Sequence, residues 1–171
     1  MAGIAESAEL GVGTIYLYFR DKADLYGSVL LEKMKQVMGG MEQALKSSAP
    51  TPEALRAAVR SQFGYHDANP HFLEIFLNQQ QAQSSPLHAR HWEELETLKR
   101  RHLGLLTECL SRGQAAGEIR QGDPQLFATV FLGMTLQIIR QRARTGGRHP
   151  LADVADTAVD CFLHGASVAQ G

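Results

Sequence analysis

Apolar residues recur at helical spacing along most of the chain, and no stretch alternates apolar and polar positions as a strand would. Residues 92–110 carry a broad apolar face opposed by charged side chains, which predicts a long amphipathic helix with one buried side. Residues 126–139 are apolar on nearly every side, which predicts a helix buried on two sides. We therefore expect an all-α protein of helices joined by short loops.

Prolines that directly follow good helix-capping residues predict where several of these helices begin. The pairs are Thr51-Pro52, Asn69-Pro70, Ser85-Pro86 and Asp123-Pro124. His149-Pro150 predicts a fifth start with a weaker cap, because it follows the stop signal of two consecutive glycines.

Composition narrows the class of protein further. The two cysteines, Cys109 and Cys161, are far apart and form no CxxC motif, which favours a reducing cytosol over a disulfide framework. No apolar run reaches the length of about 18 to 20 residues that a membrane helix needs, so we expect no membrane partner. The formal net charge of −1 gives no electrostatic sign of a nucleic-acid-binding protein.

A motif near the N-terminus nevertheless points to DNA. Residues 4–25 read IAESAELGVGTIYLYFRDKADL and resemble the helix-turn-helix of the TetR family, whose pattern has a short helix, a tight turn and GT-[IL]-Y-x-[HY]-F followed by x-x-K. The matching residues are Ile4, Ala5, Ala8, Leu10, Gly13, Thr14, Ile15, Tyr16, Tyr18, Phe19, Lys22 and Leu25. The resemblance implies a TetR-like all-α fold with a small head over residues 1–25 and a helical effector-binding and dimerisation body over residues 26–171.

The residue types of the motif suit a helix that enters the major groove, which must be thin near the backbone and carry hydroxyl or cationic groups for phosphates. Ile15 and Phe19 are expected to pack the head together, while Val12 and Leu17 match positions that face bases. The residues that the resemblance implies for DNA binding are Val12, Gly13, Thr14, Tyr16, Leu17, Tyr18 and Lys22.

Three departures from the family pattern bear on the head. The basic first helix of the family should precede Ile4, so we expect a head from which this helix is absent. Glu9 occupies the usual glycine of the turn, where a positive φ costs an L-residue roughly 1 kcal/mol. Gly11 replaces the usual Ser or Thr cap of the recognition helix and caps more weakly.

The resemblance implies that the body holds a small-molecule effector, and candidate residues for its pocket follow from the rule that ligand pockets are mostly apolar with a few polar groups. The candidate pocket residues are Phe63, His66, Phe72, Phe76, Gln80, Trp92, His102, Phe127 and Phe131. The resemblance also implies that the two last long helices form a four-helix bundle across a twofold axis. The candidate dimer residues are Leu132, Thr135, Leu136, Ile139, Val159, Phe162 and Leu163.

The family resemblance thus implies a bacterial, cytoplasmic homodimer that binds a palindromic operator and is a repressor, the family's common role, released by an unknown effector. We expect no cofactor and no enzymatic activity, because no catalytic constellation is present. The histidine pairs His88/His91 and His66/His71 have weak metal-site spacing, so no metal is expected. The alternative is a helical small-molecule-binding or interaction protein that has lost DNA binding.

Overall fold

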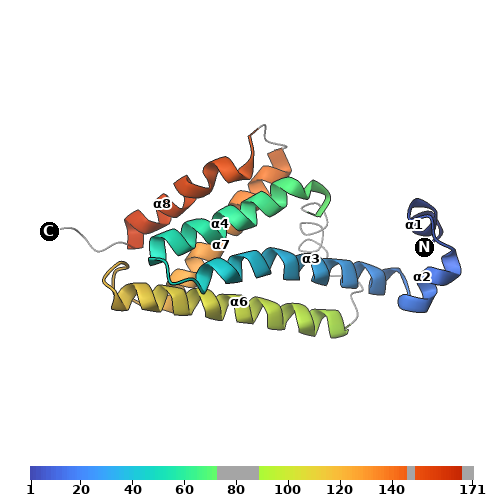
Figure 1. The fold of residues 1–171 in the computed structure, drawn as a ribbon, viewed down its shortest axis with the longest axis horizontal. Helices are drawn as coiled ribbons and strands as arrows, with labels where there is room; N and C mark the ends of the chain where they lie inside the picture. Colours follow the sequence, from blue (N-terminus) through green and yellow to red (C-terminus); the bar gives the residue numbers. More distant parts are fainter. Residues whose placement is uncertain (73–88, 146–148, 167–171) are drawn as a thin grey trace.

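Helices make up all the regular structure of the computed structural model over the residues that it describes, which are 1–72, 89–145 and 149–166 (Figure 1). In chain order they are α1 (Ala2–Ser7), α2 (Val12–Tyr18), α3 (Lys22–Leu45), α4 (Thr51–Ala68), α6 (Ala89–Ala115), α7 (Pro124–Thr145), the 3-10 turn η1 (Leu151–Val154) and α8 (Ala155–Ala166). The prediction of an all-α fold is confirmed. None of the helices in these ranges has the length and apolar character that crossing a membrane requires.

Two short helices stand apart from a larger body. Helices α1 and α2 lie at one end of α3, whereas α4, α6, α7 and α8 gather along the rest of its length (Figure 1). In the body, α3 packs on α4 and α6, α6 packs on α7, and α4 packs on α8. The predicted domain boundary after residue 25 falls inside α3, so this helix belongs to both the head and the body.

Side-chain caps explain several of the helix starts. The Asp123 carboxylate accepts a hydrogen bond from the backbone N–H of Gln125 at 2.9 Å, directly before Pro124 opens α7. At η1 the cap comes from another helix, because Asp67 of α4 accepts from the backbone N–H groups of Leu151 and Ala152. Residues 70–72 open a helical turn after Asn69-Pro70, and the predicted start at Ser85-Pro86 lies outside the described residues.

The core lies where α3, α4, α6, α7 and α8 meet. Its largest fully buried side chains are Phe63, Phe131, Met41, Leu45, Leu55, Leu106, Leu110, Ile119, Ile139, Val59, Val159 and Thr135. Helices α3 and α4 approach closely at Gly40, where an added Cβ would lie 2.2 Å from the Oγ atom of Ser61. Of the adjacent glycines Gly39 and Gly40, the second therefore serves helix packing.

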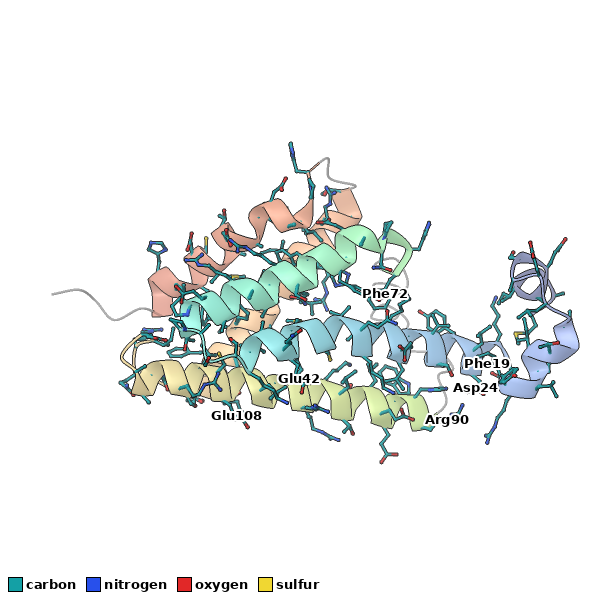
Figure 2. All side chains as sticks on the ribbon, in the orientation of Figure 1. Phe19, Asp24, Glu42, Phe72, Arg90 and Glu108 are labelled. Atoms are coloured by element: carbon teal, nitrogen blue, oxygen red, sulfur yellow. The ribbon has the colours of Figure 1, made fainter. Side chains whose placement is uncertain are left out.

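Polar contacts join α3 to α6, which run side by side in the same direction (Figures 1 and 2). The Arg101 guanidinium of α6 donates to the Glu42 carboxylate of α3 at 2.5 Å. Nearer the far end of α3, Arg112 donates to the carbonyl oxygen of Leu45 at 2.7 Å. These contacts hold the two helices in register along the part of the body farthest from the head.

Candidate functional site

The head is a helix-turn-helix in which α1 and α2 pack on each other. Ala5 and Ile15 are its buried residues, and Phe19 is half-buried beside them in the chain segment that leads to α3. The predicted packing role of Ile15 therefore agrees with its burial. Few side chains hold α1 and α2 together, so small changes in this head should have measurable effects on its stability.

The turn between α1 and α2 contains a strained residue, as the sequence predicts. Glu9 has a φ of 54°, the left-handed conformation that a glycine adopts without steric cost. The N–H of Glu9 donates to the carbonyl of Glu6 and the N–H of Leu10 donates to the carbonyl of Ala5, which together form a Schellman motif. The turn keeps its geometry despite a side chain that disfavours it.

Helix α2 presents an exposed surface to solvent. Gly11 is its N-cap and, as predicted, provides no side-chain hydrogen bond. Leu17 is 82% exposed and Tyr18 is 76% exposed, which is unusual for large apolar and aromatic side chains in the free protein. All seven residues predicted to contact DNA are exposed, namely Val12, Gly13, Thr14, Tyr16, Leu17, Tyr18 and Lys22.

A buried carboxylate lies where the head meets the body. Asp24, in the first turn of α3, is 1% exposed and receives hydrogen bonds from the backbone N–H of Arg20 at 3.0 Å and from His91 Nε2 at 2.8 Å. The Arg90 guanidinium also pairs with it (Figure 2). The Arg20 N–H, His91 and Arg90 hold the pKa of Asp24 well below its usual range, so the carboxylate is ionised.

The His91 ring lies so close to α3 that only a glycine fits opposite it. An added Cβ on Gly27 would lie 2.5 Å from Cδ2 and 2.8 Å from Cγ of the His91 ring. His91, one of the histidines with weak metal-site spacing, has its Nε2 atom against the Asp24 carboxylate. The start of α6 is thereby attached to the α3 turn that carries the head.

A cavity of about 170 Å³ lies in the body between α3, α4, α6 and α7. Apart from the Thr135 hydroxyl, which donates to the carbonyl oxygen of Leu132, four polar or charged side chains interrupt the apolar wall: Gln62, His66, Lys99 and His102. Burial lowers the pKa of His66 to about 4 and also lowers the pKa of His102. The remaining lining residues are Met34, Val37, Met38, Met41, Leu132, Thr135, Leu136 and Ile139.

The structure separates the residues predicted for the effector pocket. His66 and His102 line the cavity. Phe63, Phe72, Phe127 and Phe131 are buried in the core outside the cavity lining. Trp92 is at the surface, where the Lys99 ammonium lies over its ring. Phe76 and Gln80 lie outside the described residues.

Of the seven residues predicted for the dimer interface, four are buried within the protomer and three are half-buried. Thr135 and Ile139 are fully buried and line the cavity together with Leu132 and Leu136. The α8 residues of this set are buried or half-buried against the same core, namely Val159, Phe162 and Leu163. A helix that is apolar on nearly all sides does not indicate which face is turned inward, so composition could not assign these residues.

Several functional residues were missed in the sequence. Met34, Met38 and Met41 are spaced as one face of a helix, a signal that indicates burial without distinguishing a cavity wall from solid core. Asp24 looked like an ordinary acidic residue at a helix start. Its partners Arg90 and His91 lie 66 and 67 positions later in the chain, a distance over which no local pattern predicts a contact.

Two family models match the chain. The model described as "Bacterial regulatory proteins, tetR family" matches residues 1–29, and the model described as "Tetracyclin repressor-like, C-terminal domain" matches residues 48–166. Because the first match begins at residue 1, the expected absence of the first head helix gains no support from it.

Individual relatives agree with these matches. The Fatty acid metabolism regulator protein of Bacillus subtilis is 28% identical over 95% of this chain and 82% of its own length. The HTH-type transcriptional repressor NicS of Pseudomonas putida is 34% identical over 83% of this chain and 66% of its own length.

Solved structures share the fold. The transcriptional regulator FadR of Bacillus subtilis in complex with stearoyl-CoA has a TM-score of 0.80 at 25% identity, covering 96% of this chain and 87% of its own. The regulator PfmR of Thermus thermophilus has the same TM-score at 24% identity, covering 97% and 87% of the two chains.

Proposed function

The chain belongs to the TetR family of bacterial regulatory proteins, and on this basis we propose that it is a homodimeric DNA-binding repressor that a small-molecule effector releases from a palindromic operator. The effector is proposed to bind in the cavity of the body, and the head is proposed to contact the operator. No cofactor or catalytic step is part of this function.

One observation carries the proposal: a single helix runs from the head into the wall of the cavity. Lys22 and Asp24 lie in the first turn of α3, while Met34, Val37 and Met41 of the same helix line the cavity. A ligand that shifts α3 must therefore also shift the head. An effector acts only through a difference in affinity between the two positions of the head.

The exposed face of α2 is suited to a DNA groove. Thr14, Tyr16 and Tyr18 offer hydroxyl groups and Lys22 offers an ammonium group to phosphate oxygens, whereas Val12 and Leu17 are proposed to touch bases. Phosphate contacts set the position of a protein on DNA and do not select the sequence. Sequence preference is accordingly assigned to the two apolar residues.

A second copy of the chain is proposed to cover the outer face of α7. Leu126 is 56% exposed and Val130 is 52% exposed, and Gly133 continues the same stripe at helical spacing. No heavy atom other than those of its own helix and chain neighbours lies within 4 Å of an added Cβ on Gly133, so another helix could approach there. A twofold dimer would place two heads on half-sites about 34 to 36 Å apart.

The first experiment is an electrophoretic shift assay of the full chain on the promoter region of its own gene, at stated salt concentration. Lys22→Gln should weaken DNA binding and reduce the magnitude of the slope of log affinity against log salt by about one. Lys33→Gln makes the same charge change on α3 farther from the head and should leave both the DNA affinity and its salt dependence unchanged. Absence of specific binding by the wild-type chain would favour the alternative, a ligand-binding protein without DNA binding.

The effector is sought in the same assay by adding compounds to the protein–DNA complex. Stearoyl-CoA is a rational first compound, because the similar regulator FadR was solved in complex with it. Release of the promoter fragment at a concentration that saturates the protein would identify an effector. Size-exclusion chromatography with light scattering, on the wild-type chain and on Val130→Lys, tests the dimer surface separately.

A further inference from the structure

The cavity of the body contains polar atoms that have no partner within the described part of the chain. Gln62 Oε1 and both ring nitrogens of His102 are buried there without a hydrogen bond. His102 is 5% exposed, so solvent reaches it little. Buried polar groups are normally paired, and leaving one unpaired destabilises a fold, so each such group requires an explanation.

The two histidines of this cavity are uncharged at neutral pH. Burial lowers the pKa of His102, with the Glu42 carboxylate opposing the shift only in part, and burial lowers the pKa of His66 to about 4 despite the nearby Asp67. Both imidazoles are therefore neutral. Lys99, the charged residue of the lining, has its ammonium bonded to Glu96 at 2.7 Å and placed over the Trp92 ring.

The size of the cavity limits what it can hold as it stands. Its volume is about 170 Å³, close to that of an engineered apolar cavity of roughly 150 Å³ that binds benzene. The three methionines of the wall present flexible, polarisable side chains that adapt to a small apolar body. A single ring or a short chain matches this space.

We propose that Gln62 and His102 bind the uncharged hydroxyl group of a compact and otherwise apolar effector. A neutral imidazole has one donor and one acceptor nitrogen, and the Gln62 oxygen is an acceptor. A hydroxyl group can donate one hydrogen bond and accept another, so it complements these atoms. A carboxylate at the same place would instead be buried beside neutral side chains, because the Lys99 ammonium is already paired with Glu96, and this is unfavourable. This assignment rests on the proposed function, because it specifies the ligand of the same cavity.

Three probes of similar size test the assignment: benzyl alcohol, toluene and benzoate. Of the five methionines, Met34, Met38 and Met41 line the cavity, and Met1 and Met134 do not, so ¹³C-methyl NMR of the full chain reports binding at this site. Benzyl alcohol should shift the three cavity signals and bind about tenfold more tightly than toluene, since toluene leaves the polar atoms unpaired. Benzoate should bind most weakly at neutral pH.

Substitutions identify the groups responsible. His102→Leu and Gln62→Leu should each raise the melting temperature of the free protein, because each removes an unpaired buried group, and should abolish the preference for benzyl alcohol over toluene. Gln43→Leu, at an exposed position of α3, should change neither property. A purely structural role for His102 or Gln62 would give the opposite change in melting temperature.

Other outcomes overturn the assignment and leave the regulator proposal testable. Tightest binding by benzoate at neutral pH, or an unchanged preference in both variants, would show that the pair does not select a hydroxyl group. If stearoyl-CoA releases the promoter fragment while none of the three probes shifts the cavity methionines, the repressor function stands and the compact effector is excluded. If no promoter fragment binds at all, the proposed function fails whatever the probes show.

Discussion

The ionised carboxylate of Asp24 accepts a hydrogen bond from His91 Nε2 at 2.8 Å and so attaches the first turn of α3 to the beginning of α6. An ionised carboxylate has no proton to donate, so the His91 Nε2 atom carries the hydrogen. The contact joins the helix that carries the head to a helix that, like it, lines the cavity of the body. Changes at this contact are expected to affect both stability and DNA binding.

Asp24→Asn tests the electrostatic part of this contact. The pKa of Asp24 is lower in the folded than in the unfolded chain, so its stabilising contribution is present above about pH 4 and is lost as the pH falls below that value. The variant should be less stable than the wild type at neutral pH, and the difference should shrink by about pH 3. Urea unfolding at both pH values measures this.

The matched control is Asp153→Asn, an exposed aspartate of η1. It should change the free energy of unfolding little at either pH. A difference between wild type and Asp24→Asn that stays constant from neutral pH to about pH 3 would contradict the assignment of an ionised, paired carboxylate.

Gly27→Ala tests the steric part of the same contact. The added methyl group would overlap the His91 ring, and we expect a loss of about 1–3 kcal/mol in the free energy of unfolding. Gly39→Ala on the same helix is the control, because nothing lies within 4 Å of its added Cβ and alanine favours the helix by up to about 1 kcal/mol. Equal effects of the two substitutions in urea unfolding would argue against close packing at His91.

Glu9→Gly should stabilise the head by about 1 kcal/mol, because glycine adopts the positive φ of this turn without steric cost. Hydrogen exchange of the α1 and α2 amides measures the local stability of the head, which global unfolding does not report separately. Glu6→Gly makes the same change inside α1 and should destabilise the head by about the same amount. Slower exchange in Glu6→Gly than in Glu9→Gly would refute the strain argument.

Gly13→Ala is expected to separate folding from DNA binding. No neighbouring atom lies within 4 Å of the added Cβ in the free protein, so the helix should become up to about 1 kcal/mol more stable. Affinity for the operator should fall about tenfold, because the methyl group keeps α2 away from the DNA backbone. Gly3→Ala in α1 is equally unhindered and should leave affinity, measured by fluorescence anisotropy, unchanged.

Local patterns predicted the parts of the fold that depend on local chemistry. The Asp123 cap before Pro124, the positive φ of Glu9 and the weak cap at Gly11 all follow from the conformational preferences of single residues. The helix-turn-helix could be identified because its residue types recur at constant spacing within some twenty positions.

The parts that depend on long-range packing could not be predicted in this way. The sequence predicts Ile139 at a dimer interface although it is buried in the protomer, because an apolar residue fits a protein interior and a subunit interface equally well. Gln62 belongs to the cavity only because α4 turns it toward α6 and α7. Which face of each helix is buried is decided by all the helices together.

The parallel pairing of α3 and α6 has a mechanical consequence for the head. α3 has 24 residues and is therefore about 36 Å long, and contacts to α6 exist at both of its ends. Such a pair of helices rotates as one rigid body, so a rotation of about 5° about the distal end displaces the head by about 3 Å. In the proposed mechanism, a ligand that moves the wall of the cavity by a fraction of that distance has its motion amplified at the head.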